Sequence, residues 1–276
     1  MKLLPNDIRY IIIPDVHGRN FWKSITQYIE TNPNINIIFL GDYLDPYPYE
    51  KISFKESIDN FKEIISFASE NKNNVILLVG NHDMSYIGRR YICQCRHNDK
   101  YHLEVQDLFC DNASLFKIYH MIKEMTTDKH LLFSHSVLSK PYYEHCTDLP
   151  VKDLNTFVIN QNMLLYEALT GTGTNKEMDA FYNNLALISY ERGGDDKFGS
   201  SIWEDFLMFY KDDSIWINDV DMIVGHTQLE NKPIKLFNTA LNTWAINLDC
   251  RKPFILTIYD TITDMNGDVD IQNINI

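Results

Sequence analysis

The sequence predicts an α/β protein in which short buried strands alternate with amphipathic helices. Five apolar runs are rich in β-branched residues and too short for helices, which predicts strands: IRYIIIP, INIIFL, NNVILLV, KHLLF and DMIV. Apolar residues recur at helical spacing between several of these runs. In sheets flanked by helices, ligands bind at the carboxyl ends of strands, so polar residues that follow the runs are expected to share one edge.

The segments between and after the runs carry the other expected elements. The first helical segment presents an apolar face made of Phe21, Ile25, Tyr28 and Ile29. The second opens with a capping box of Ser53 and Glu56, and its apolar positions are Phe54, Ile58, Phe61, Ile65 and Ala68. Residues 85–129 and 142–213 are polar and helical in pattern, with a break at GTGT (171–174), and we interpret both stretches as cap insertions. Near the end of the chain, TWAINLD and FILTIYD predict a strand pair that completes a second sheet.

A short polar motif follows each of the five apolar runs. In chain order the motifs are DVHG (15–18), GDYLD (41–45), GNHD (80–83), SHS (134–136) and GHT (225–227). They offer oxygen and nitrogen donors without a thiolate, namely Asp15, His17, Asp42, Asn81, His135 and His226. One divalent ion cannot use so many donors. Two ions about 3.5 to 4 Å apart can, with a carboxylate such as Asp42 between them, and such a pair suits hydrolysis at phosphorus.

The order and residue types of these motifs resemble the calcineurin-like metallophosphoesterases. The GDYLD and GHT forms are most similar to the phosphoprotein phosphatase-like branch, which includes bacterial and phage serine/threonine phosphatases. The resemblance covers most of the chain, from Asp15 to His226. It implies a four-layer α/β/β/α sandwich of two mixed sheets flanked by helices, with helical cap insertions. A length of 276 residues is near the upper size for one hydrophobic core, so we expect a single domain over residues 1–276.

The resemblance also implies a role for each motif residue. The first metal would be held by Asp15, His17 and Asp42, and the second by Asp42, Asn81, His135 and His226. His82 would stay unligated and face the leaving group, oriented by Asp45. An imidazole paired with a carboxylate can hold a proton near neutral pH, and a general acid contributes about 10² to 10⁴ in rate. Taken singly, each motif has a structural alternative as a turn or a satisfied polar group, and His130 lies in the same strand region as His135.

One departure from the family pattern concerns the phosphate-binding arginine. The family carries GDxxDR, and here Pro46 takes the position of the arginine. We expect Arg192, in ERGGDDKFGSSIWEDF, to replace it, because a planar guanidinium binds phosphate oxygens in pairs. Arg19 is the second candidate. The structural alternative for Arg192 is a helix-end turn with an ion pair to Asp195 or Asp196.

The second departure is Gln228, which stands where many members carry the last histidine of GHxH. It favours the phosphoprotein phosphatase-like branch over phosphodiesterases and leaves the first metal fewer protein ligands. The resemblance implies hydrolysis of phosphate monoesters by in-line attack of a hydroxide that bridges the metals, with Mn²⁺ expected first and Fe or Zn²⁺ as alternatives. Other functions compatible with the sequence are a nucleotide or dinucleoside polyphosphate hydrolase, a nucleic-acid repair phosphatase, and a metal-free protein-binding scaffold of the same fold.

Composition and charge bound the partners and the location. The chain has 276 residues and a formal net charge of −13, which two dications (+4) reduce to about −9. A phosphorylated substrate is expected, whereas long nucleic acid is a poor partner because its affinity comes largely from Lys and Arg. With no apolar stretch near the roughly 18 to 20 residues of a membrane span, we expect a cytoplasmic protein without membrane attachment. Five cysteines indicate reduced thiols, and the cluster Cys93, Cys95, His97 and His102 lacks the CxxC spacing typical of structural zinc.

Overall fold

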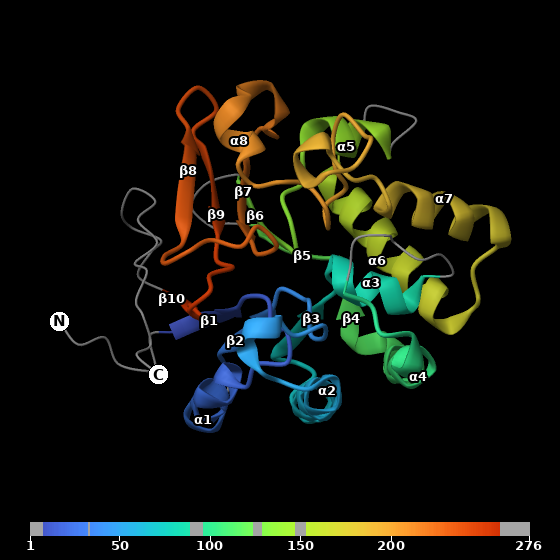
Figure 1. The fold of residues 1–276 in the computed structure, drawn as a ribbon. Helices are drawn as coiled ribbons and strands as arrows, with labels where there is room; N and C mark the ends of the chain where they lie inside the picture. Colours follow the sequence, from blue (N-terminus) through green and yellow to red (C-terminus); the bar gives the residue numbers. More distant parts are fainter. Residues whose placement is uncertain (1–7, 33, 89–95, 124–128, 147–152, 260–276) are drawn as a thin grey trace.

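The computed structural model describes residues 8–32, 34–88, 96–123, 129–146 and 153–259. In this part of the chain, two five-stranded mixed sheets pack face to face (Figure 1). Sheet A has the strand order β10-β1-β2-β3-β4, and sheet B has the order β5-β6-β7-β9-β8. Helices α1 and α2 lie on the far side of sheet A, and α5 and α8 lie on the far side of sheet B. The predicted arrangement of two mixed sheets flanked by helices is therefore confirmed.

Sheet A contains the first three predicted strands. Its strands are β1 (Ile8–Ile13), β2 (Asn36–Phe39), β3 (Val75–Leu78), β4 (Phe116–Lys117) and β10 (Leu256–Tyr259). The first four run parallel, with Ile11 opposite Ile37 and Ile37 opposite Val75, whereas β10 is antiparallel to β1. Parallel strands covered on both faces need apolar side chains at successive positions, which is why these runs are continuous rather than alternating.

Sheet B contains the other two predicted strands. Its strands are β5 (Tyr119–Lys123), β6 (His130–Ser134), β7 (Val220–Val224), β8 (Ile234–Asn238) and β9 (Thr243–Asn247). β6, β7 and β9 are parallel, with β5 and β8 antiparallel at the edges. The predicted pairing of TWAINLD with FILTIYD is wrong. β9 pairs with β7 and β8 in sheet B, while β10 pairs with β1 in sheet A, because the intervening chain crosses from one sheet to the other.

Two apolar cores follow from the alternation of side chains along each strand. Between the sheets lie residues such as Tyr10, Ile12, Ile38, Phe133, Ile223 and Ile246. Neighbouring positions such as Ile11 and Ile37 point the other way and pack beneath the helices with Phe61 of α2. Burying both faces of the sheets fixes their register, because a slip by one residue would exchange the two sets.

The second predicted helix forms as expected, whereas the first is divided into a 3-10 helix and a short α-helix. The α-helices are α1 (Thr26–Thr31), α2 (Phe54–Glu70), α3 (Asn81–Ile87), α4 (His102–Asp111), α5 (Lys140–His145), α6 (Leu154–Thr170), α7 (Asn175–Leu185) and α8 (Met208–Lys211). Short 3-10 helices are η2 (Phe21–Ile25), η3 (Pro48–Glu50), η4 (Asp99–Tyr101), η5 (Ala113–Leu115), η6 (Tyr190–Arg192) and η7 (Asp213–Ile215). The capping box of Ser53 and Glu56 is present at α2, and Gly171 ends α6 in the left-handed conformation.

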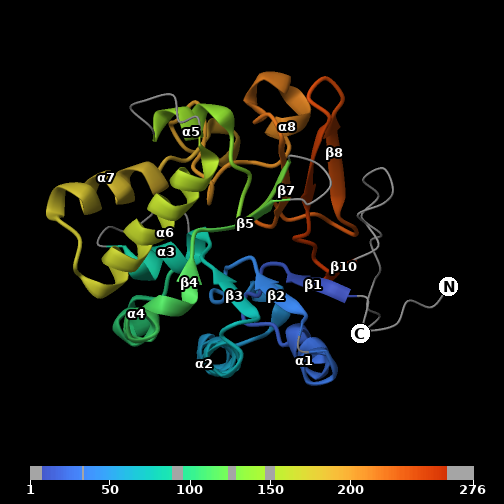
Figure 2. The same cartoon turned by 180° about the vertical axis from the view of Figure 1, so that it is seen from behind.

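The two stretches interpreted as cap insertions contain α4, η4, η5, α6, α7, η6 and α8. The first, 85–129, also supplies β4 and β5, one edge strand of each sheet, which the sequence pattern did not indicate. Helix α6, from the second stretch, packs against both of these edge strands (Figure 2). The division into one domain with two insertions stays a prediction. No helix in the described part of the chain is long and apolar enough to cross a membrane.

Candidate metal centre

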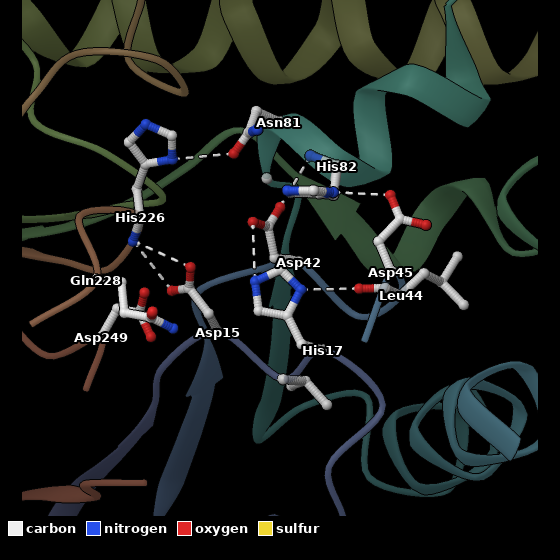
Figure 3. Close-up of polar contacts among 12 residues, drawn as sticks. Asp15, His17, Asp42, Leu44, Asp45, Asn81, His82, His226, Gln228 and Asp249 are labelled. Atoms are coloured by element: carbon white, nitrogen blue, oxygen red, sulfur yellow. Dashed lines mark hydrogen bonds and ion pairs between the residues drawn. The ribbon is translucent and has the colours of Figure 1, made fainter. Parts of the chain in front are cut away.

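The five polar motifs begin within two residues of the last residues of strands β1, β2, β3, β6 and β7, and their side chains meet at this end of the two sheets (Figure 3). The six predicted metal ligands are all buried, with exposed fractions from 0% to 6%: Asp15, His17, Asp42, Asn81, His135 and His226. The structure thus brings together every donor that the sequence placed at a strand end. Their roles as metal ligands stay a prediction.

Asp42 lies at the middle of this donor set. Its Oδ2 is 3.6 Å from Nε2 of His17 and 3.4 Å from Nε2 of His135. Two groups of three residues place their donor atoms within 4.8 Å of one another and could each hold a metal ion, namely His17, Asp42 and His82, and Asp15, Asp42 and His135. Asp42 belongs to both groups. Burial raises the pKa of Asp42 well above its usual value, and the charge of Asp15 adds to this effect.

Two of the imidazoles are aimed at the centre by backbone carbonyls. Nδ1 of His17 is 2.9 Å from the carbonyl of Leu44, and Nδ1 of His135 is 2.9 Å from the carbonyl of Leu40. With Nδ1–H donating to a carbonyl, Nε2 of each ring is left as the lone-pair donor that faces Asp42. Burial, helped by the charges of His82, Arg96 and Arg19, lowers the pKa of His17 well below its usual value. His17 is therefore neutral, as a metal ligand must be.

His226 and Asn81 form the opposite side of the centre. Oδ1 of Asn81 is 2.9 Å from Nδ1 of His226 and 2.9 Å from Nε2 of His135. The backbone N–H of His226 donates to both carboxylate oxygens of Asp15, each at 3.1 Å. Burial and then the positive charge of Arg192 lower the pKa of His226 well below its usual value. This ring is also neutral and available to a cation.

The backbone of the centre is unusual in four of its non-glycine residues. His17, Asp42, Asp45 and His226 have positive φ angles of 45°, 52°, 57° and 70°. Such left-handed conformations are uncommon for side-chain-bearing residues and gather at functional sites. The neighbouring glycines leave room for this packing. A Cβ on Gly80 or on Gly225 would collide with the carboxylate of Asp42 or of Asp15, respectively.

Asp83, the last residue of GNHD, joins two of the loops and received no role from the sequence. Its Oδ2 accepts the backbone N–H groups of Asp42 at 2.7 Å and Gly80 at 2.8 Å, and its Oδ1 accepts that of Tyr43 at 3.0 Å. Burial raises the pKa of Asp83 to about 7 in spite of these donors. The motif itself was the available signal, because its fourth position is a carboxylate directly beside two predicted site residues.

Asp249 is a second carboxylate that the sequence analysis missed. It follows β9, is fully buried, and lies near Asp15 and Gln228 (Figure 3). Neither carboxylate oxygen has a hydrogen-bond partner among the described residues, and the nearest cation is Arg19, with Nη2 at 3.9 Å from Oδ1. Burial, and after it the charge of Asp15, raise the pKa of Asp249 well above its usual value. The signal in the sequence was an aspartate at the end of the strand-like run TWAINLD.

These features fit divalent cations. The centre combines neutral imidazoles, an amide oxygen and several buried carboxylates, a donor set that suits Mn²⁺, Fe or Zn²⁺. The carboxylate oxygens of Asp249 are buried without a hydrogen-bond partner among the described residues. Buried polar atoms without partners are costly, and bound dications would supply partners for donors of this kind and offset the negative charge.

His82 and Asp45 form a hydrogen-bonded pair beside the metal ligands. Nδ1 of His82 is 2.7 Å from Oδ2 of Asp45 (Figure 3). The hydroxyl of Tyr86 donates to the other carboxylate oxygen of Asp45 at 2.6 Å, a contact that the sequence analysis did not anticipate. The ring of His82 stands perpendicular to that of His17, with 5.0 Å between centroids. Asp45 is thereby held on both oxygens and fixes the orientation of His82.

The two arginines considered from the sequence have different surroundings. Arg192, at the end of η6, reaches the centre: its Nη2 donates to the carbonyl of His226 at 3.4 Å, and its Nη1 is 3.4 Å from Oδ2 of Asp205. Its carboxylate partner is therefore Asp205, and not Asp195 or Asp196. The buried Arg19 donates to the carbonyls of Asp15, Val16 and Cys250, which ties the first motif to the chain after β9.

Of the cysteine–histidine cluster, the structure describes His97 and His102. Cys93 and Cys95 lie outside the described residues, so the zinc question stays open to experiment. Of the other two members, Nδ1 of His102 is 3.2 Å from Nε2 of His97, and Nδ1 of His97 is 3.2 Å from the hydroxyl of Ser85.

The two facing mixed sheets carry at the ends of their strands a cluster of buried carboxylates and imidazoles that could hold metal ions. A family described as Calcineurin-like phosphoesterase matches residues 8–229, and the chain belongs to this family. It is therefore a phosphoesterase. The resemblance stated from the sequence motifs is confirmed.

Solved structures show the same fold at low sequence identity. The chain is similar to a cold-active protein tyrosine phosphatase, with 14% identity and a TM-score of 0.52 over 92% of this chain and 74% of that chain. It is also similar to a serine/threonine phosphatase from Saccharomyces cerevisiae related to human PP5, with 15% identity and a TM-score of 0.51 over 95% of this chain and 78% of that chain. No curated protein matches the sequence.

Proposed function

We propose that this phosphoesterase hydrolyses phosphate monoesters at a centre of two divalent ions. Asp15, His17 and Asp42 would hold the first ion, and Asp42, Asn81, His135 and His226 the second. The observation that carries the proposal is the central position of Asp42, whose Oδ2 lies 3.6 Å from Nε2 of His17, a proposed ligand of the first ion, and 3.4 Å from Nε2 of His135, a proposed ligand of the second. One carboxylate between two donor sets is the arrangement that a bridged metal pair requires.

When bound, a pair of such ions supplies an activated water and neutralises charge on the phosphoryl oxygens. The side chains supply the remaining parts of the reaction. His82 would donate a proton to the leaving oxygen, and Asp45, 2.7 Å from Nδ1, would keep the ring oriented. Arg192 would bind a phosphoryl oxygen from the side of His226.

The position of His82 is compatible with a second role. Its donor atom falls within one of the two groups that could hold a metal ion, together with His17 and Asp42. A histidine that ligates a metal also commonly donates its other N–H to a carboxylate, so the bond to Asp45 fits both roles. We favour the general acid because the other six donors already serve two ions, and the metal content of a His82 variant distinguishes the two roles.

The proposal is tested by the metal content and phosphatase activity of the purified protein. After incubation with excess Mn²⁺ and removal of free metal, elemental analysis should find two ions per chain in the wild type. Asp42→Asn should lower the occupancy of both sites and abolish hydrolysis of nitrophenyl phosphate. Asp59→Asn is the matched control, because Asp59 pairs with Lys55 on the surface of α2. A wild-type protein that binds no metal and hydrolyses no phosphoester would contradict the proposal.

A further inference from the structure

Arg96 is held beside the proposed catalytic pair by two residues of the second motif region. Its Nε and Nη2 donate to the carbonyl of Asp45, at 3.1 and 2.7 Å. Its guanidinium carbon lies 4.1 Å from the centroid of the Tyr47 ring, a distance at which a cation is attracted to an aromatic face. A side chain with this many contacts has a defined position at the rim of the centre.

Arg96 differs from Arg192 and Arg19 in its ion pairs. Within the described ranges, Arg96 forms no ion pair with a carboxylate, and its hydrogen bonds to Asp45 use only the backbone carbonyl. Arg192 is paired with Asp205, and Arg19 lies among backbone carbonyls and two carboxylates.

The carbonyl that accepts both hydrogen bonds from Arg96 belongs to the peptide bond that joins Asp45 to Pro46. Pro46 is the position at which the family motif would carry its arginine. The guanidinium of Arg96 therefore lies next to the backbone of Pro46, the position from which the family arginine would extend. Two of its five N–H groups bond to the carbonyl, which leaves donors free for an anion.

We propose that Arg96 binds the phosphoryl oxygens of the substrate and replaces the arginine lost at Pro46. This inference rests on the proposed hydrolysis of phosphate monoesters at this centre. Arg96 would act together with Arg192, which approaches from the opposite side through His226. Tyr47 serves as the platform that orients the guanidinium, and it stacks in turn on Tyr49, with 5.2 Å between ring centroids.

The experiment compares Arg96→Ala and Arg96→Lys with the wild type as full-length, Mn²⁺-loaded proteins. Lys100→Ala is the matched control, because Lys100 is an exposed cation on the same segment that lies 4.8 Å from the ring centroid of Tyr101. The measurements are KM and kcat for nitrophenyl phosphate, the inhibition constant of inorganic phosphate, metal content and melting temperature. The inhibition constant reports directly on anion binding, which a purely structural residue would not change selectively.

Arg96→Ala should raise KM and weaken phosphate inhibition by about 10- to 100-fold, the loss expected for charge-assisted hydrogen bonds. Arg96→Lys should recover only part, because lysine restores the charge without the planar fork. Metal content should stay at the wild-type value in all variants, and Lys100→Ala should match the wild type throughout.

Three results would overturn the assignment, and each has a different meaning. If the wild type is active and Arg96→Ala keeps its KM and phosphate inhibition within about twofold, Arg96 does not bind phosphate and the proposed function stands. If Arg96→Ala instead loses metal or unfolds at a much lower temperature, the residue supports the loop and not the substrate. If the wild type neither hydrolyses phosphoesters nor binds phosphate, both the function and the assignment are wrong.

Discussion

Replacing His82 by asparagine should separate chemistry from metal binding at this centre. His82→Asn removes the proton donor, and a general acid typically contributes about 10² to 10⁴ in rate. We therefore expect kcat for an alkyl phosphate to fall by about that factor while two ions per chain remain. The side chain is nearly buried, with 10% of its surface exposed, so water is poorly placed to replace it.

The structure also orders the effects of the residues behind His82. Asp45→Asn keeps the shape but removes the charge 2.7 Å from Nδ1, and a hydrogen bond to a charged group is worth about 1.5 to 3 kcal/mol, or about 10- to 100-fold in kcat. Tyr86→Phe removes only the hydroxyl that donates to the far oxygen of Asp45, and it should cost less than about tenfold. The expected order of losses is His82, then Asp45, then Tyr86.

The assay is a series of phosphate monoesters whose leaving groups differ in pKa. Nitrophenol leaves readily without a proton, so the loss in His82→Asn should be smaller for nitrophenyl phosphate than for alkyl phosphates. Metal content is measured on the same preparations. Equal losses across the whole series would refute the general-acid role, and a missing ion in His82→Asn would make His82 a ligand instead.

Three further predictions concern other parts of the molecule. Arg192→Ala should raise KM and lower kcat/KM, by a factor that corresponds to about 1.5 to 3 kcal/mol of transition-state stabilisation, without loss of metal. Unchanged kinetics and phosphate inhibition would mean that Arg192 is only a turn residue paired with Asp205. His120, on β5, has a pKa lowered to about 4 by burial and then by Lys117. The unfolded chain therefore binds this proton more tightly, and stability should fall by about 2 to 3 kcal/mol as pH drops from about 6.5 to 4. His120→Gln should flatten this part of the unfolding free energy measured against pH, and parallel curves for the two proteins would contradict it. Changing Cys93 and Cys95 together to serine should leave metal content, activity and melting temperature near wild type, whereas loss of one zinc per chain would show a structural site.

The strands and motif residues were predictable because their signals are local. A continuous β-branched run such as the one ending at Ile13 is buried on both faces in any helix-flanked sheet, and the polar residues after it then fall at the sheet edge. The capping box of Ser53 and Glu56 likewise acts within one turn of helix. Elements of this kind need no knowledge of the rest of the chain.

The missed features depend on contacts between distant segments. FILTIYD has the same pattern whichever sheet it joins, and only the crossing of the chain after Asp249 assigns it to sheet A. Asp83 joins two loops only because the backbone of Asp42 lies within hydrogen-bond distance of its carboxylate. Arg96 contacts Asp45 from a segment in which the sequence predicts no strand. A single sequence contains no local pattern that indicates such contacts between distant segments.

The pairing of β1 with β10 has a consequence for how this protein is made. Ile8 lies opposite Tyr259, so β1 receives its neighbour on that side only after residues 14–255 have been synthesised. Until then the backbone of β1 is an open edge beside the apolar run Ile11, Ile12 and Ile13, the kind of surface that pairs with other chains. Translation that stops before Leu256 would therefore release a product prone to aggregate, even though its last predicted metal ligand, His226, is already in place.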